Sequence, residues 1–469
     1  MNETKTEIYR AAWVLPISGE PIENGEVIVE RGRIVETRQA RPNTETTRDF
    51  GNAILMPGLV NVHTHLDYTV MRGILEDIEF FPWIRELTAR KMALTAEDWI
   101  TSAAWGAAEA LAGGITTIGD CTDSGAACDG ALEFGIGGII YQEVFSLDGQ
   151  SVDALVQDLA EKVRQMATKT AGTNLRVGVS PHAPYTVRPE LFRALQVYVS
   201  GENLSLCIHA AESLAEAELL LNGTGLIAEM YGRRGIAWHA PGMSTVAYLD
   251  SLGVLGPQTL LVHGVQVAAS DRHILAARNF GWAYCPKSNA KLGNGVAPLG
   301  LLGRKPLPEG TDQSKIQNPK SKIGLGSDSV ASNNAMDLFE EMRFAVLMQR
   351  GARHKIAALT AREAVEMAPI GGAGALGLDA EIGTLEPGKR ADLCAVSLNA
   401  LHATPAYDPY SALVYAASAS DVICTIIGGE TKYDATRGAA PESRFPDSNI
   451  TALREKMKIA ARKMRDWRI

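Results

Sequence analysis

The chain has 469 residues, of which 46% are hydrophobic and 21% charged, and its formal net charge is −9. This composition is ordinary for a globular protein, and the lack of a lysine- or arginine-rich run argues against nucleic acid as a partner. No apolar run reaches the roughly 18 residues of a membrane span, and the N-terminus has no apolar signal core. The six cysteines are scattered without a CxxC pair, so we expect reduced thiols in a cytoplasmic protein.

The two ends of the chain share a pattern of short β-strands. Between residues 7 and 56, alternating apolar runs such as Glu26–Glu30 and Arg33–Glu36 are separated by glycine, proline and asparagine. Similar runs return at residues 383–396 and 422–429. We therefore predict that residues 1–56 and 384–435 form one composite β-sandwich domain.

The segment between these ends alternates apolar runs of strand length with longer amphipathic stretches. Such alternation predicts parallel strands joined by crossover helices. Eight such units over about 270 residues favour an α/β fold of the TIM-like (β/α)8 type, which we assign to residues 57–383. The strand candidates are residues 57–65, 114–120, 135–143, 175–182, 204–212, 259–264, 281–286 and 323–328.

Two further segments differ from this pattern. Residues 304–322 are rich in proline, lysine and glutamine and show neither helical nor strand periodicity, which predicts a polar, solvated insertion before the last barrel strand. Residues 449–469 are charged and predict a C-terminal helix.

Polar residues recur at the ends of the predicted strands. In Pro57-Gly-Leu-Val-Asn-Val-His-Thr-His65, the two histidines are two residues apart, so both point to the same side of a strand. The carboxyl ends of barrel strands form one face, where active sites lie. We therefore expect one cavity to collect His63, His65, His182, His209, Glu212, His263 and Asp328.

These residue types predict a metal centre. A catalytic zinc-type site uses nitrogen and oxygen ligands and keeps one position open for water. The candidate ligands are His63, His65, His209 and Asp328, while His263 is either a ligand or the hydrogen-bond partner of the bound water. Zinc is the default for this ligand set, with iron, manganese and cobalt as alternatives. The fourth predicted strand has no lysine that could bridge a second ion, so we predict one divalent metal.

A metal of this kind generates hydroxide at neutral pH, and a neighbouring carboxylate can take up and return the proton. Asp328 fits that role. Glu212 lies three residues beyond His209, so it can reach the substrate instead of the metal. A carboxylic acid there could protonate a ring nitrogen while hydroxide attacks the adjacent carbon.

The strand-end motifs resemble the amidohydrolase superfamily. Within it, the chain looks most like the aminohydrolase branch that includes 5′-methylthioadenosine/S-adenosylhomocysteine deaminase and aminodeoxyfutalosine deaminase. The motifs that carry the resemblance, beside the His-x-His strand, are Ser-Pro-His182-Ala-Pro-Tyr185, His209-Ala-Ala-Glu212, Val262-His-Gly264 and Gly326-Ser-Asp-Ser-Val-Ala-Ser-Asn-Asn334.

The resemblance implies a metal-dependent hydrolytic deaminase of a purine nucleoside or related nitrogen heterocycle, of the 5′-substituted adenosine type, that releases ammonia. It implies that His63, His65, His209 and Asp328 bind the metal, that His263 orients the hydroxide, and that Glu212 and Asp328 move protons. It also implies substrate contacts for Trp83, in the long loop after the first barrel strand, and for His182, Glu212, Ser288 and Asn289.

Two alternatives stay open. Another hydrolase on this scaffold, a chlorohydrolase or a cyclic amide hydrolase, would use the same metal site. A non-enzymatic interaction module would have lost its ligands, whereas all of them are present here. In the S-adenosylhomocysteine enzymes, arginines after the third strand receive the amino-acid carboxylate. This chain has no arginine between Tyr141 and Arg164, which argues against that substrate. We expect the binding partner to be a small heterocyclic substrate molecule. The resemblance also allows a homo-oligomer.

Overall fold

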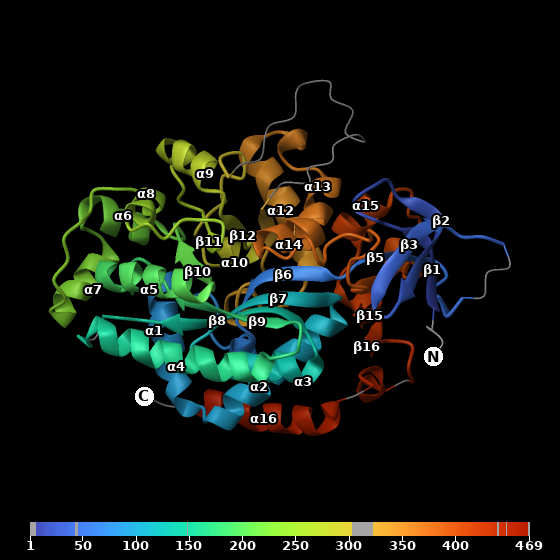
Figure 1. The fold of residues 1–469 in the computed structure, drawn as a ribbon. Helices are drawn as coiled ribbons and strands as arrows, with labels where there is room; N and C mark the ends of the chain where they lie inside the picture. The colour runs from blue at the N-terminus through green and yellow to red at the C-terminus, as the bar shows by residue number, and fades with distance from the viewer. Residues whose placement is uncertain are drawn as a thin grey trace.

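The computed structural model describes residues 6–42, 46–147, 149–302, 322–438, 440–446 and 448–467. Its centre is a sheet of eight parallel strands in which chain order and spatial order coincide (Figure 1). The strands are β6 (Leu59–Thr64), β7 (Ile115–Thr122), β8 (Gly137–Val144), β9 (Leu175–Pro181), β10 (Ser205–Ala210), β11 (Thr259–His263), β12 (Gly281–Tyr284) and β13 (Ile323–Leu325). The predicted barrel and its eight strands are confirmed.

The barrel is closed by contact between its first and last strands. A parallel bridge joins Thr64 to Asp328, and the backbone N–H of Asp328 donates to the carbonyl of His63 at 2.9 Å. Helices cover the outside of the sheet, so the strands are buried on both faces, which explains why they read as continuous apolar runs. Every residue of β7 and β8 is buried.

The helices that follow the strands match the amphipathic stretches of the sequence. Several begin at side-chain caps, such as the capping box of Thr95 and Asp98 at α2. None of the described helices is both long enough and apolar enough to span a bilayer. The larger helices are α1 (Phe80–Arg90), α2 (Ala96–Ala112), α3 (Ala126–Phe134), α4 (Val152–Thr170), α5 (Pro189–Glu202), α6 (Leu214–Asn222), α7 (Leu226–Arg234) and α12 (Leu338–Arg353). Shorter helices are α8 (Thr245–Ser251), α9 (Arg272–Arg278), α10 (Pro286–Lys291), α11 (Val330–Asn333), α13 (Ala361–Glu366), α14 (Gly372–Ala375) and α15 (Pro409–Ser411).

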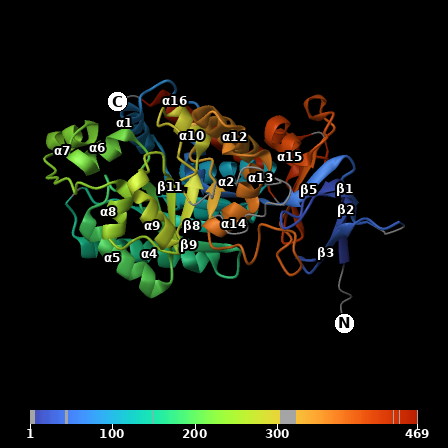
Figure 2. The ribbon, with the colours of Figure 1, turned by 90° about the horizontal axis from the view of Figure 1, so that it is seen from above.

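Both ends of the chain meet in a second sheet beside the barrel (Figures 1 and 2). Its strands form one continuous mixed sheet in the order β16-β15-β14-β5-β1-β2-β3, and β4 pairs with β1. The pairing of the two chain ends follows the prediction, although a single sheet takes the place of two facing sheets. The strands are β1 (Thr6–Val14), β2 (Ile22–Glu30), β3 (Arg33–Gln39), β4 (Arg48–Asp49), β5 (Ala53–Pro57), β14 (Leu393–Ser397), β15 (Val422–Ile427) and β16 (Glu430–Asp434).

A helix near the C-terminus, α16 (Ile450–Asp466), packs along α2 on the outside of the barrel, at the bottom of the view in Figure 1. Lys463 pairs with Asp98 of α2 at 2.6 Å. Ala460 and Met464 are fully buried in an apolar cluster that also contains Trp83 of α1. The helix therefore supports the segment that covers one side of the barrel mouth. The predicted insertion at residues 304–322 lies, apart from residue 322, outside the described residues.

We expect Met464→Ala to destabilise the protein, because it removes a fully buried side chain from this cluster. The cost of such a truncation is about 2–5 kcal/mol. Thermal unfolding followed by circular dichroism measures it. Ile459→Ala, at an exposed position of the same helix, is the control and should leave the midpoint almost unchanged. Equal midpoints for the two variants would show that α16 does not stabilise the barrel.

Candidate metal centre and active site

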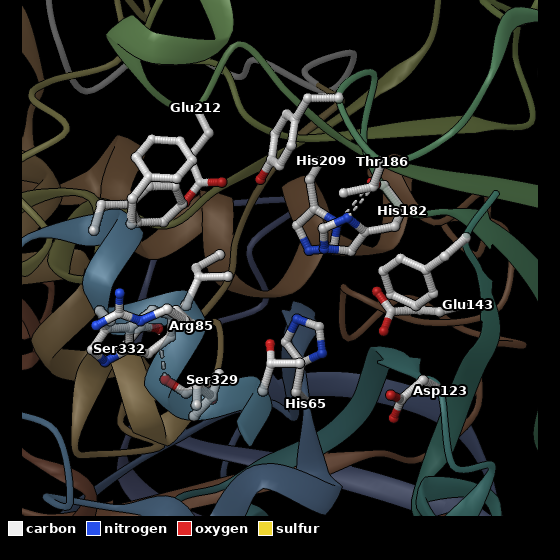
Figure 3. Close-up of a pocket in the computed structure, with 18 of the residues that line it drawn as sticks. His65, Arg85, Asp123, Glu143, His182, Thr186, His209, Glu212, Ser329 and Ser332 are labelled. Carbon is white, nitrogen blue, oxygen red and sulfur yellow. Dashed lines mark hydrogen bonds between the residues drawn. The ribbon is translucent and has the colours of Figure 1, made fainter. Parts of the chain in front are cut away.

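A cavity of about 730 Å³ opens at the carboxyl ends of the barrel strands. Figure 3 shows His65 and His209 near its centre, with Glu212 on one side and Glu143 and Asp123 on the other. Most of the predicted site residues line this cavity, and His63 lies beneath it with no exposed surface. Those that line it are Trp83, His65, His182, His209, Glu212, His263 and Asp328.

Three of the predicted metal ligands form a compact group. His63, His65 and His209 can each offer a ring nitrogen, and the three nitrogens lie within 4.8 Å of one another. The ring centroid of His63 is 4.9 Å from those of both His65 and His209. The Nε2 atom of His63 is buried and has no hydrogen-bond partner among the described residues. Buried polar atoms nearly always have a hydrogen-bond partner. A buried ring nitrogen without one is therefore a position where a cation would bind.

Asp328 supplies the carboxylate of the group. Its Oδ1 atom lies 3.4 Å from Nε2 of His63 and 3.7 Å from Nε2 of His65. Burial alone would raise the pKa of the Asp328 carboxyl, but the imidazoles of His63, His263 and His65 hold it well below its usual range. Burial would likewise lower the pKa of His63, yet Asp328 and Cys207 together raise it to about 10. The position between the Asp328 carboxylate and the His63 ring therefore favours a positive charge.

The backbone around Asp328 is shaped for this approach. Asp328 has φ of 58°, in the left-handed region that L-residues rarely adopt, and such strain concentrates at functional sites. A Cβ atom on Gly326 would lie 2.9 Å from Cβ of His63, so only glycine lets the last strand come this close to the first. The other carboxylate oxygen of Asp328 accepts hydrogen bonds from Ser288 Oγ at 2.5 Å and from Ser332 Oγ at 2.9 Å.

Hydrogen bonds also orient His209 and His182. The Nδ1 atom of His209 lies 3.0 Å from the carbonyl oxygen of His182, which fixes Nδ1 as the donor and leaves Nε2 for a metal. Burial lowers the pKa of His209 well below its usual value, so the ring is neutral, as a metal ligand must be. His182 in turn places Nδ1 2.8 Å from Thr186 Oγ1 and lines the cavity.

His263 and Glu212 face each other across 3.8 Å, measured from Nε2 to Oε1. The Nδ1 atom of His263 lies 3.0 Å from Oδ1 of Asn289, so Nε2 points toward the cavity as the free ring nitrogen. Burial lowers the pKa of His263 to about 4. Burial, together with the charge of Asp328, raises the pKa of Glu212 to about 8. At neutral pH the pair is a neutral imidazole beside a carboxylic acid, which can donate a proton.

Glu216 was missed by the sequence analysis and holds the turn that carries Glu212. Its carboxylate accepts the backbone N–H groups of Ala211 at 2.8 Å and Glu212 at 3.0 Å, and the hydroxyl of Thr245 at 2.9 Å. Ala211 has φ of 52°, so this turn needs external support. The sequence did contain a signal: Glu216 is an acidic residue four positions after Glu212, in the first turn of α6.

The structure places three predicted substrate contacts differently from the expectation. Ser288 and Asn289 are fully buried behind Asp328 and His263 and are not among the residues that line the cavity. Ser288 contacts Asp328 and Asn289 contacts His263, because α10 begins at Pro286, shortly after β12. That either residue reaches the substrate stays a prediction. Trp83 does line the cavity but belongs to helix α1, not to a loop.

The sequence analysis also missed a polar group on the opposite wall. Lys91 places Nζ 2.6 Å from Tyr68 Oη and forms an ion pair with Asp123. Glu143, at the end of β8, lies nearby and lines the same cavity. Lys91 comes from the segment after α1, so no strand-end motif marked it.

Comparisons with known proteins agree with this site. The family model described as "Amidohydrolase family" matches residues 54–432. A 5-methylthioadenosine/S-adenosylhomocysteine deaminase of Symbiobacterium thermophilum is 32% identical over 431 residues, which cover 90% of this chain and 92% of the relative. A 5′-deoxyadenosine deaminase of Methanococcoides burtonii is 30% identical over 436 residues, covering 91% and 92%. The crystal structure of an adenosine deaminase from Xanthomonas campestris with bound zinc has a TM-score of 0.82 and 26% identity, covering 98% of both chains. The resemblance stated from the motifs is confirmed, and the chain belongs to the amidohydrolase family.

Proposed function

We propose that the protein is a metal-dependent hydrolytic deaminase of a 5′-substituted adenosine or a closely related purine nucleoside. The observation that carries the proposal is the Glu212 carboxyl, whose pKa is raised to about 8, placed 3.8 Å from Nε2 of His263 at the edge of a cluster of three histidines and one aspartate. The names of the relatives agree with a hydrolase that acts on the carbon–nitrogen bond of a cyclic amidine.

The residues that would hold one divalent ion are His63, His65, His209 and Asp328. The donor set of three neutral or neutralisable imidazoles and one carboxylate fits zinc, and iron, manganese or cobalt would fit the same ligands. When bound, such an ion lowers the pKa of water toward 7 and so supplies the nucleophile at neutral pH.

The chain's own residues would then manage protons and orientation. Asp328 stays ionised because its pKa is held low, so it can take a proton from the attacking water. Glu212, protonated at neutral pH, can donate to the ring nitrogen next to the carbon under attack. His263 is neutral and fixed by Asn289, so its Nε2 atom can direct the water and accept or donate a single hydrogen bond.

The remaining cavity suits a nucleoside. Its volume of about 730 Å³ lies within the usual range of small-molecule sites. Phe80, Phe81 and Trp83 of α1 contribute an apolar wall on which a flat heterocycle can stack. His182 lies on the side of His209 away from Glu212 (Figure 3), where it would contact the sugar of a bound nucleoside.

Substrate identity is tested by ammonia release from the zinc-loaded protein. The panel contains adenosine, 5′-methylthioadenosine, 5′-deoxyadenosine, S-adenosylhomocysteine, aminodeoxyfutalosine, guanine and cytosine. We expect release from one or more adenine nucleosides, and weaker activity on S-adenosylhomocysteine because the chain lacks the arginines expected after the third strand. No release from any compound, together with chloride release from a chlorinated triazine, would assign the site to a chlorohydrolase.

Replacing Glu212 with glutamine tests the proton donor. Glu212→Gln should keep its metal but lose at least about 100-fold in kcat, the usual contribution of a general acid. Metal content and ammonia release measure the two effects. Glu218→Gln, on the neighbouring helix α6, is the control for a generic loss of carboxylate. Turnover near that of the unmodified protein would remove Glu212 from the mechanism.

The pH profile follows from the raised pKa of Glu212. The carboxyl is protonated below a pH of about 8 and ionised above it, so a step that needs the acid form weakens as pH rises. We expect kcat/KM to fall about tenfold per pH unit above that value. Profiles of initial ammonia release across pH 6 to pH 10 measure it, with a buffer series at constant ionic strength. A profile that stays flat to pH 10 would contradict an acid at this position.

A further inference from the structure

The side chain of Glu143 is left without a partner in the cavity wall. It lies at the end of β8, is only 6% exposed, and lines the same cavity as the metal ligands. Its Oε1 atom is buried and accepts no hydrogen bond from any described residue. A buried carboxyl of this kind is costly unless something pairs with it. Since the side chain lines a cavity, a bound molecule is the natural partner.

The neighbours of Glu143 indicate what that molecule brings. Lys91 is a cationic residue that lines the same cavity, and it is already engaged by Asp123 and by Tyr68. Among the described residues, no lysine, arginine or histidine forms an ion pair with Glu143 within 4.0 Å. The wall therefore offers oxygen atoms that can accept hydrogen bonds, beside an ammonium group that is already paired. This favours neutral hydroxyl donors over an ammonium group or an anion.

The geometry of a purine directs its sugar to this wall. N1 and N9 lie on opposite edges of the ring system, and the sugar is attached at N9. If Glu212 donates to N1 while C6 lies at the histidine cluster, N9 points away from Glu212. Figure 3 shows Glu143 and Asp123 on the side of His65 and His209 opposite Glu212. A carboxylate oxygen of Glu143 and ring nitrogens of His182 and His209 all lie within 4.8 Å of one another, so Glu143 and His182 form one polar wall beside the histidine cluster.

We propose that Glu143 is a specificity-determining residue that accepts hydrogen bonds from the vicinal hydroxyls of a ribose, with the Lys91–Asp123 pair completing the subsite. This inference rests on the proposed deaminase function and extends it from the base to the sugar. It assigns preference for ribonucleosides to a residue at the third barrel strand.

The test compares two substrates across two variants. The zinc-loaded protein is assayed with adenosine and with 2′,3′-dideoxyadenosine, which lacks both hydroxyls. We expect a preference for adenosine of about 10- to 100-fold in kcat/KM, the size expected when a buried hydrogen-bond acceptor is left unsatisfied. Glu143→Ala should reduce kcat/KM for adenosine by a similar factor and change that for the dideoxynucleoside less than about twofold. Glu143→Gln can still accept a hydrogen bond through its amide oxygen. Its kcat/KM for adenosine should therefore lie between that of Glu143→Ala and that of the unmodified protein.

Glu133→Ala, at an exposed position of α3, is the control, and metal content and thermal unfolding of each variant show that the site is intact. If Glu143→Ala does not fold, Glu143→Gln alone still distinguishes the outcomes, because it keeps the shape of the side chain. Equal losses for the two substrates would overturn the ribose subsite and leave the deaminase standing. No ammonia from either substrate with metal bound in the unmodified protein would overturn both.

Discussion

The backbone hydrogen bond from Asp328 to the carbonyl of His63 is the contact on which the site depends. It closes the barrel between β13 and β6 and brings a carboxylate from the last strand beside the two histidines of the first. Gly326 permits the approach because any Cβ atom there would collide with His63. Closure of the fold therefore also brings the candidate metal ligands together, and a sequence change that loosened the closure would also separate these residues.

Burial then sets the charge of each group. His209 and His263 are kept neutral, Asp328 is kept ionised by the imidazoles around it, and Glu212 is kept protonated near neutral pH. Two carboxyl groups in one cavity thus have different protonation states, which is the arrangement that acid–base chemistry needs. Hydrogen bonds from residues outside the cavity offset the free-energy cost of burying these charged and polar groups. Ser288 and Ser332 donate to Asp328, and the carboxylate of Glu216 holds the turn before Glu212.

The sequence allowed the barrel and the strand-end residues to be predicted, because both follow from local patterns. Eight apolar runs with helical stretches between them leave few alternative folds, and the carboxyl end of each run places its histidine or carboxylate on one face. The pairing of the two chain ends was also predictable from their similar strand patterns. That they join into a single sheet was not, since the junction is the antiparallel pairing of β5 with β14, two strands more than 300 residues apart in the sequence.

The supporting residues could not be predicted for a physical reason. Ser288 and Asn289 act on Asp328 and His263 from a helix whose orientation depends on packing against α12, which no local pattern shows. The polar wall is built from three separate segments of the chain, which contribute Glu143, Asp123 and Lys91. The sequence shows which residue types are present, whereas the partner of each buried polar atom is decided by the tertiary structure.

The central claim is that His63, His65, His209 and Asp328 hold one divalent ion on which the reaction depends. The most direct measurement is metal content per chain, by inductively coupled plasma mass spectrometry, together with ammonia release from an adenine nucleoside, for His65→Ala and for His273→Ala. His273 is exposed on α9 and serves as the matched control. We expect His273→Ala to keep about one metal ion per chain and normal ammonia release, and His65→Ala to lose both. Full metal content in His65→Ala, or unchanged ammonia release after its metal is gone, would contradict the metal centre described here.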